Sequence, residues 1–174
     1  MPKKKLLILG AGGFGQAVAE VATLLEKWSD IDFVDDRWPE LTHVKTYSVI
    51  SNLKNLDLID LENYEAIVAV GNNQLRYQWY TRLEQLNVSL TTIIHPSVIK
   101  SITSIIDLGV IIMAGCILGT ATRIEKGVIL NIGTLLDHDV IIKSYSHLSV
   151  GVGVAAGQTI KEFSFLDVGT KVGH

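Results

Sequence analysis

The stretch GVILNIGTLLDHDVII, residues 127–142, identifies the fold of its half of the chain because it belongs to a strict six-residue repeat. From Ile106 onward every sixth residue is aliphatic: Ile112, Leu118, Ile124, Leu130, Leu136, Ile142, Leu148, Val154, Ile160, Leu166 and Val172. The position two residues before each of these holds a small or β-branched residue, with Gln158 as the exception: Val110, Cys116, Thr122, Val128, Thr134, Val140, Ser146, Val152, Ser164 and Thr170. A solenoid needs such a fixed step, whereas hairpin loops vary in length. The period predicts a parallel β-helix with three steps to a coil.

The chain before His95 follows a different pattern, in which strand-like and helix-like segments alternate. Strands are expected over residues 5–10, 31–36, 64–71 and 88–95, and helices over 14–28 and 73–86. Residues 38–63 fit short helices or loops equally well. We therefore expect two domains: an α/β Rossmann-like domain over 1–95 with a parallel sheet of three or four strands, and the β-helix over 96–174.

Composition narrows the class of protein. The chain has 174 residues, of which 48% are hydrophobic, and a formal net charge of -3. These values favour a folded core and argue against a nucleic-acid binder. The apolar run after Lys3–Lys5 is too short for a signal peptide or a membrane span, so we expect a cytoplasmic protein without membrane insertion. The single cysteine, Cys116, offers neither a disulfide nor a zinc site.

A glycine pattern follows the first expected strand. Gly10, Gly12 and Gly15 form Gly-x-Gly-x-x-Gly before a helix, where backbone N–H groups can hold phosphate oxygens. Asp35 and Asp36 end the second strand, near where such folds carry an acidic residue for a ribose hydroxyl. With few strands available, a mononucleotide-sized ligand is favoured over a dinucleotide. The alternatives are a tight turn that needs glycine and an acidic pair in solvent.

One histidine stands between two aspartates at a corner of the repeat. His138 is the second residue after the inward Leu136, so its side chain is expected to point outward. Neutral imidazole suits a general base, and an adjacent carboxylate can orient it. A solvent-exposed turn histidine is the alternative. One coil later, Ala156 should stack on residue 138 at a strand spacing of about 4.8 Å, where its N–H can stabilise an oxyanion.

Four segments together resemble a known family. Residues 8–18 (ILGAGGFGQAV), 69–76 (AVGNNQLR), 93–99 (IIHPSVI) and 135–142 (LLDHDVII) are similar to the sialic-acid O-acetyltransferase and bacillosamine N-acetyltransferase family of hexapeptide-repeat acyltransferases. The resemblance spans essentially the whole chain. It implies a left-handed β-helix, a homotrimer, acetyl-CoA as co-substrate, no metal, and acetylation of an amino group on a nucleotide-linked sugar, with UDP as the expected nucleotide, in bacterial surface-glycan synthesis.

The resemblance also implies roles for individual residues. It makes His138 the base, Asp139 its orienting partner and Ala156, where the family more often has glycine, the oxyanion donor. The nucleotide-linked sugar would contact Gly10, Gly12, Gly13, Phe14, Gly15, Asp35, Asp36, Gly71 and Asn72. Acetyl-CoA would contact Asn131, His147, Ala156 and Gly157.

Three other functions remain open at this point. The first is a sugar O-acetyltransferase of the sialic-acid type. The second is a zinc carbonic anhydrase built on a β-helix, which needs three histidine ligands, whereas the repeat offers His138 and His147. The third is a non-catalytic nucleotide-sugar-binding protein. It is suggested by DVGTKVGH, residues 167–174, which stops within the repeat pattern and predicts a β-helix shortened relative to the family.

Overall fold

A computed structural model of the chain describes residues 3–173. The chain divides into two compact units, and the boundary lies between Thr91 and Thr92, just before the boundary predicted at 95/96. Within the described residues no helix is both long enough and apolar enough to cross a bilayer.

A six-stranded sheet forms the centre of the N-terminal unit. Its strand order is β3-β4-β2-β1-β5-β6. The strands are β1 Lys5–Leu9, β2 Ile31–Val34, β3 His43–Val44, β4 Tyr47–Ser51, β5 Tyr64–Val68 and β6 Ser89–Leu90. All neighbours are parallel except β3, which pairs antiparallel with β4. The prediction of three or four strands was therefore too low, because part of the unassigned region 38–63 forms the β3–β4 edge of the sheet.

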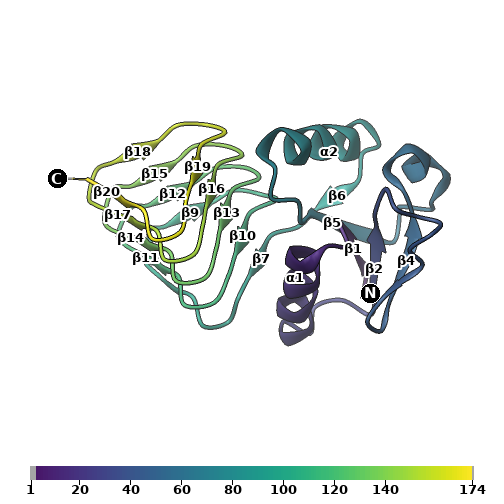
Figure 1. Ribbon diagram of the computed structural model, residues 1–174. Coiled ribbons are helices and arrows are strands. Elements are labelled where there is room, and N and C mark those ends of the chain that lie inside the picture. Colours follow the sequence, from purple (N-terminus) through teal and green to yellow (C-terminus); the bar gives the residue numbers. More distant parts are fainter. Residues whose placement is uncertain (1–2, 174) are drawn as a thin grey trace. The chain divides into compact units, whose positions relative to one another are not determined.

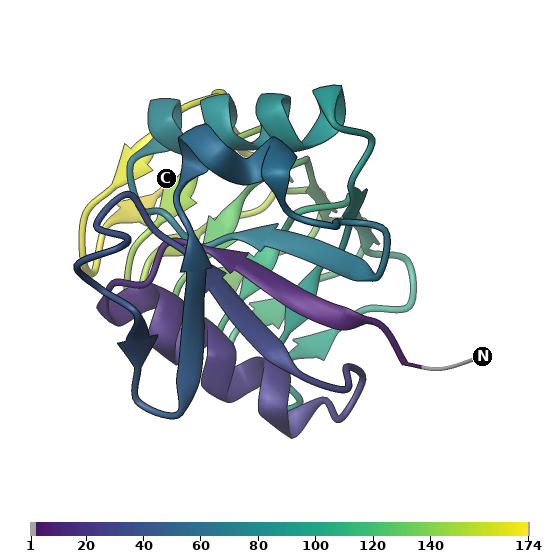
Figure 2. The ribbon, with the colours of Figure 1, turned by 90° about the vertical axis from the view of Figure 1, so that its right-hand side faces the viewer.

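Helices cover both faces of this sheet. Figure 2 shows helix α1 (Gly13–Leu24) on one face, and helix α2 (Asn73–Gln85) with the short 3-10 helix η1 (Leu53–Leu58) on the other. The apolar spacing of α1 buries its Val18, Ala19 and Ala22 side chains against the sheet. Because both faces are covered, β1 is apolar from Leu6 to Leu9, all four completely buried.

The segment expected to form one strand over residues 88–95 is divided between the two units. Ser89–Leu90 pairs with β5 as the last strand of the sheet, whereas Ile93–Ile94 pairs with β10 as the first strand of the β-helix. The Thr91 N–H still donates to Ala66 O in the N-terminal unit, while the Ile93 N–H donates to Val110 O in the other. The prediction of a single strand was wrong because an apolar run does not reveal a change of hydrogen-bonding partner.

The C-terminal unit is a left-handed parallel β-helix of two-residue strands. Figure 1 shows the strands stacked coil upon coil. One face contains β7 Ile93–Ile94, β10 Ile111–Ile112, β13 Ile129–Leu130, β16 His147–Leu148 and β19 Phe165–Leu166. The second contains β8 Ile99–Lys100, β11 Ile117–Leu118, β14 Leu135–Leu136, β17 Gly153–Val154 and β20 Lys171–Val172. The third contains β9 Ile105–Ile106, β12 Arg123–Ile124, β15 Ile141–Ile142 and β18 Thr159–Ile160.

The register of the stacked strands confirms the six-residue period. Paired residues are 18 apart, as in Leu118↔Leu136 and Leu136↔Val154, so each coil contains three repeats. Both inward positions of the repeat contribute to one continuous apolar core. The core side chains with no exposed surface include Val128, Leu130 and Val140. Since the inward positions are filled by buried aliphatic or small residues, the corners and outward positions are the places where polar chemistry can be located.

Candidate active site

His138 lies at the corner between β14 and β15. Leu136, two residues earlier, is inward and 3% exposed, whereas the His138 side chain is 59% exposed. His138 Nδ1 lies 2.8 Å from Asp139 Oδ2. The backbone N–H of His138 donates to Asp137 Oδ1 at 2.7 Å. The two aspartates therefore do different things: one contacts the imidazole ring, and the other contacts the backbone of the turn.

Asp139 has a left-handed backbone conformation, with φ of 58°. Glycine fills the same corner position one coil later, at Gly157, whose φ is 70°. The Asp139 N–H donates to Thr120 O of the preceding coil at 2.8 Å, which fixes the turn. A carboxylate side chain in this conformation carries some backbone strain. Aspartate at this corner nevertheless supplies a contact that glycine could not, the one between its carboxylate and His138.

The electrostatic setting of His138 favours its protonated form. The hydrogen bond to Asp139, together with the negative charge of Asp137, raises the pKa of His138 above its ordinary value. A carboxylate accepts but cannot donate, so Asp139 selects the neutral tautomer that carries its proton on Nδ1. The Nε2 lone pair is then left to accept a proton from a ligand.

The next coil supplies a backbone donor beside this corner. The pairing Leu136↔Val154 puts residue 156 over residue 138. The Gly157 N–H donates to His138 O at 3.0 Å, which links the two turns. The Ala156 N–H donates no hydrogen bond to any residue in the described part of the chain, and Ala156 is half-buried. The corner thus combines an oriented imidazole with an open N–H donor.

Gly119 is a tightly packed residue of this corner that the sequence analysis did not identify. Its N–H donates to Leu136 O at 2.9 Å, so it lies one coil below Asp137. A Cβ added to Gly119 would lie 2.8 Å from Asp137 C and 2.9 Å from His138 N. The six-residue period reveals the inward positions and gives no sign of this requirement, which arises from an outward position one coil away.

Two other predicted residues lie elsewhere on the β-helix. Asn131 follows β13 at the preceding corner, where its Oδ1 accepts the Ile132 N–H at 2.8 Å. His147 belongs to β16, is 8% exposed and meets the Phe165 ring edge-on at 5.1 Å between centroids. Asn131 and His147 lie at the same sheet of the β-helix, because β13 and β16 are neighbouring strands. By contrast, β14, which leads to His138, belongs to another sheet. Within one chain, Asn131 and His147 do not join the His138 corner.

The glycine loop of the N-terminal unit contains glycines of two kinds. A Cβ at Gly15 would lie 1.9 Å from Gly10 O, and a Cβ at Gly10, whose φ is 106°, would lie 2.9 Å from Ala69 O. By contrast, a Cβ at Gly12 or Gly13 would meet no described atom within 4 Å. Gly15 is therefore required where α1 packs against the end of β1, and Gly10 is required where the chain passes the residues that follow β5. Gly12 and Gly13 leave the start of α1 open to a ligand.

The start of α1 also has the polarity of an anion site. Its N-cap residue, Gly12, has no side chain that could occupy the backbone N–H groups of the first turn. That turn also contains no acidic residue within the described range Gly13–Leu24. Backbone N–H groups at such a terminus favour phosphate or carboxylate. Phe14, half-buried, is part of this first turn. The loop lies at the carboxyl end of β1, the edge of a parallel sheet where ligands bind in this kind of fold.

The other predicted N-terminal residues lie at the carboxyl ends of β2 and β5. Asp35 is 9% exposed and accepts the Ala11 N–H at 2.8 Å. Asp36 is exposed and accepts the Leu53 N–H at 3.1 Å. Asn72 caps α2 by accepting the Leu75 N–H at 2.9 Å.

Gly71 is held by a buried cation. The completely buried guanidinium of Arg76 donates to Gly71 O at 3.2 Å and to Val70 O at 2.9 Å. The structure thus brings the ends of β1, β2 and β5 to one edge, as the predicted parallel topology requires.

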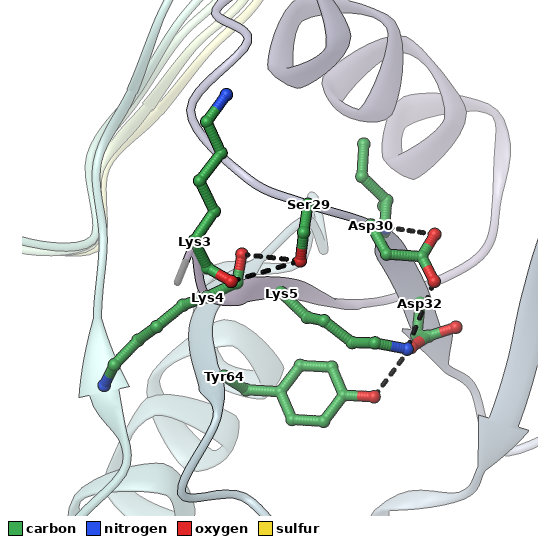
Figure 3. Close-up of polar contacts among 8 residues, drawn as sticks. Lys3, Lys4, Lys5, Ser29, Asp30, Asp32 and Tyr64 are labelled. Atoms are coloured by element: carbon green, nitrogen blue, oxygen red, sulfur yellow. Dashed lines mark hydrogen bonds and ion pairs between the residues drawn. The ribbon is translucent and has the colours of Figure 1, made fainter. Parts of the chain in front are cut away.

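A polar cluster marks the opposite edge of the sheet (Figure 3). The Tyr64 hydroxyl donates to Asp32 Oδ2 at 2.6 Å, and Lys5 Nζ lies 3.3 Å from the same oxygen and 3.1 Å from Asp30 Oδ2. Burial and the hydrogen bond to Asp32 raise the pKa of Tyr64. Since these groups satisfy one another at the amino ends of β1, β2 and β5, they stabilise the sheet and are separate from the glycine-loop edge.

No group of three or more histidine, cysteine, aspartate or glutamate side chains in residues 3–173 is arranged to hold a metal ion. Cys116 is buried inside the β-helix, and burial raises the pKa of its thiol. An inward thiol with a raised pKa is a poor nucleophile. The outward polar groups of the His138 corner are therefore the better candidates for chemistry.

Comparison with known proteins gives matches over both units. The family model described as the PglD N-terminal domain matches residues 5–83. UDP-N-acetylbacillosamine N-acetyltransferase of Bacillus subtilis (strain 168) is 29% identical over 116 residues, which are 64% of this chain and 52% of that protein. The matched region thus spans about half the length of this curated relative.

Two solved structures resemble the whole chain. The acetyltransferase domain of PglB from Neisseria gonorrhoeae FA1090, in complex with acetyl coenzyme A, superposes with a TM-score of 0.92. It is 32% identical, and the match covers 97% of this chain and 82% of that one. PerB from Caulobacter crescentus, in complex with CoA and GDP-perosamine, gives a TM-score of 0.80 at 25% identity and covers 97% of this chain and 88% of that one.

Proposed function

Because the chain belongs to the family of hexapeptide-repeat acyltransferases that includes the PglB acetyltransferase domain, we propose that it transfers the acetyl group of acetyl-CoA to an amino group of a nucleotide-linked sugar. The observation that carries the proposal is the His138 corner, where an imidazole oriented by Asp139 lies next to the open N–H of Ala156. Bacterial surface-glycan synthesis is the setting that the resemblance implies.

The mechanism uses His138 as general base. Nδ1–H of His138 donates to Asp139, and Nε2 accepts a proton from the sugar amine as its nitrogen attacks the thioester carbonyl. A C–N bond forms, and the tetrahedral oxyanion accepts a hydrogen bond from the Ala156 N–H. When the C–S bond breaks, the imidazolium returns the proton to the departing thiolate. Asp139 stabilises the imidazolium in between.

The glycine loop is assigned to the nucleotide-linked acceptor. Gly12 and Gly13 leave space at the start of α1, where the diphosphate would accept backbone hydrogen bonds. Gly10, Gly15 and Phe14 shape this loop, and Asp36, Gly71 and Asn72 line the same edge of the sheet. The resemblance implies UDP as the nucleotide, and contacts to the base would set this preference.

The acetyl-CoA residues imply more than one subunit. Asn131 and His147 do not meet His138 within one chain, so all three can act in one site only if a second copy contributes a face. Apolar side chains are exposed on the outward face and adjoining corner that would meet such a copy: Ile99, Ile117, Ile132, Leu135, Val150 and Val168. A homotrimer with Asn131 and His147 from one subunit, and His138, Ala156 and Gly157 from the next, satisfies both observations.

Thiol release from acetyl-CoA tests this function. Purified protein is supplied with UDP-linked and GDP-linked sugars that carry either a 4-amino or a 4-hydroxyl group, and a reaction without acceptor serves as the control. We expect release with an amino sugar and a product that resists hydroxylamine, because hydroxylamine cleaves esters and leaves amides intact. A hydroxylamine-sensitive product would indicate O-acetylation instead. A folded protein that releases no thiol with any acceptor would overturn the acetyltransferase assignment.

A further inference from the structure

Arg37 is a cation beside the glycine loop that the sequence analysis did not assign. One carboxylate oxygen of Asp35, Oδ2, accepts both the Ala11 N–H at 2.8 Å and Arg37 Nη2 at 3.0 Å. The other oxygen, Oδ1, accepts Arg37 Nε at 2.7 Å and the Arg37 backbone N–H at 3.1 Å. Because a single oxygen joins the two groups, the guanidinium lies next to the residue that precedes Gly12.

These contacts change the role expected of Asp35. A carboxylate offers about four acceptor positions, and four N–H groups already occupy those of Asp35. The residue is 9% exposed. Burial acts to raise its pKa, but the hydrogen bonds from Arg37 and Ala11 more than offset this, so the pKa of Asp35 lies below its ordinary value and the group is ionised. Asp35 cannot accept a ribose hydroxyl unless one of these bonds breaks.

Arg37 has the opposite character. Its side chain is 60% exposed, and the paired contact with Asp35 fixes its orientation. The remaining N–H groups of the guanidinium make no hydrogen bond to any residue within 3–173. A fork held on one side by a buried carboxylate is preorganised, so little conformational entropy is lost when its free side binds an anion.

We propose that Arg37 binds the diphosphate of the nucleotide-linked acceptor and that Asp35 is its positioning residue rather than a ligand. The proposal rests on the proposed function, because it concerns the same acceptor. The position supports it: the cation lies beside Ala11, next to the open residues Gly12 and Gly13 and the start of α1. Guanidinium and phosphate form strong paired hydrogen bonds, and the backbone donors of the loop alone carry no full charge.

Binding measurements with Arg37 variants test the proposal. Wild type, Arg37→Met and Arg37→Lys are titrated calorimetrically with UDP, GDP and the nucleosides uridine and guanosine. We expect Arg37→Met to weaken binding of the preferred diphosphate by about tenfold or more and to leave nucleoside binding unchanged. Arg37→Lys retains the charge without the fork, so its affinity should be intermediate. Arg123→Met, which removes an exposed arginine from the β-helix, is the matched control and should bind like wild type.

Each outcome has a distinct meaning. Wild type that binds neither diphosphate would contradict the proposed function and, with it, the role of Arg37. Wild type that binds while Arg37→Met binds equally well would overturn the Arg37 proposal alone. If Arg37→Met weakens nucleoside and diphosphate binding by the same factor, Arg37 contacts the base or ribose and the assignment to phosphate is wrong. A smaller dependence of diphosphate affinity on salt in Arg37→Met would support the phosphate contact.

Discussion

The glycine loop of the N-terminal unit and the His138 corner of the β-helix distribute structural and chemical roles differently. At the corner the roles belong to different residues: Leu136 and Val140 point inward and are buried, whereas His138 between them is exposed. In the loop the roles are interleaved among identical residues, because Gly10 and Gly15 are required by packing while Gly12 and Gly13 face open space. At the corner, the inward or outward direction of a side chain predicts its role. In the loop, the role of each glycine depends on the atoms that surround it.

The largest effect is expected from exchanging the two kinds of glycine. Gly15→Ala places a Cβ against Gly10 O, so β1 and α1 must move apart, and we expect the free energy of unfolding to fall by about 3 kcal/mol. Gly12→Ala meets open space at a φ of -77° and should change stability by less than about 0.5 kcal/mol, while weakening nucleotide binding. Urea unfolding measures the stability of the two variants, and calorimetric titration with the nucleotide measures the binding. Equal stability of the two variants would break the distinction between them.

The Gly119→Ala variant tests whether the corner is as separable as its sequence suggests. The added methyl group would press on the backbone of Asp137 and His138, so we expect a loss of about 1 to 3 kcal/mol in unfolding free energy and a lower kcat. Gly115→Ala introduces backbone strain at another corner, where φ is 72° and no contact is closer than 3.9 Å. It should lose stability but keep kcat. A Gly119→Ala enzyme with the wild-type kcat would show that the turn tolerates displacement.

Asp139 should illustrate a conflict between stability and activity. Replacement by glycine relieves the left-handed conformation and is expected to raise the free energy of unfolding by about 1 kcal/mol. The same change removes the partner of His138 Nδ1, so kcat should fall by about tenfold or more. Asp139→Asn retains the side-chain shape and should lose activity as well. Denaturant unfolding and steady-state rates are compared; a Gly variant that is fully active would exclude the orienting role.

The smallest effect is expected at Asp137. Asn131 already shows that an amide at this repeat position accepts the next backbone N–H, so Asp137→Asn should preserve the turn. It removes a negative charge that raises the pKa of His138. The base must be neutral to act, so the rate rises with pH through that pKa, and the variant's acid limb should move to lower pH. Asp107→Asn, at a different corner, is the control. The pH profile of kcat/KM would contradict this account if it shifted to higher pH or did not move.

The sequence predicted the β-helix well because its signal is local and periodic. Each inward side chain must lie above the one 18 residues earlier, so the packing leaves a repeat that can be read residue by residue. The N-terminal edge strands β3 and β4 had no such period and remained ambiguous. The segment 88–95 was assigned to one strand because its hydropathy does not change where its hydrogen-bonding partners do.

The candidate site was predictable where direction follows from the repeat. The positions of His138 and Ala156 follow from counting, although their roles stay predictions. Arg37 could not be found by counting, because its guanidinium folds back onto Asp35 and reaches the loop through that carboxylate. The division of Gly10 and Gly15 from Gly12 and Gly13 likewise depends on atoms distant in sequence, such as Ala69 O.

The most direct test of the central claim is the turnover of His138→Ala in a protein whose folding has been verified. Because His138 points outward, we expect kcat to fall by about 100-fold or more, with unfolding free energy within about 0.5 kcal/mol of wild type. His43→Ala, which removes an exposed histidine of the other unit, should retain full activity. A His138→Ala enzyme that turns over within roughly threefold of wild type would contradict the claim that this corner supplies the catalytic base.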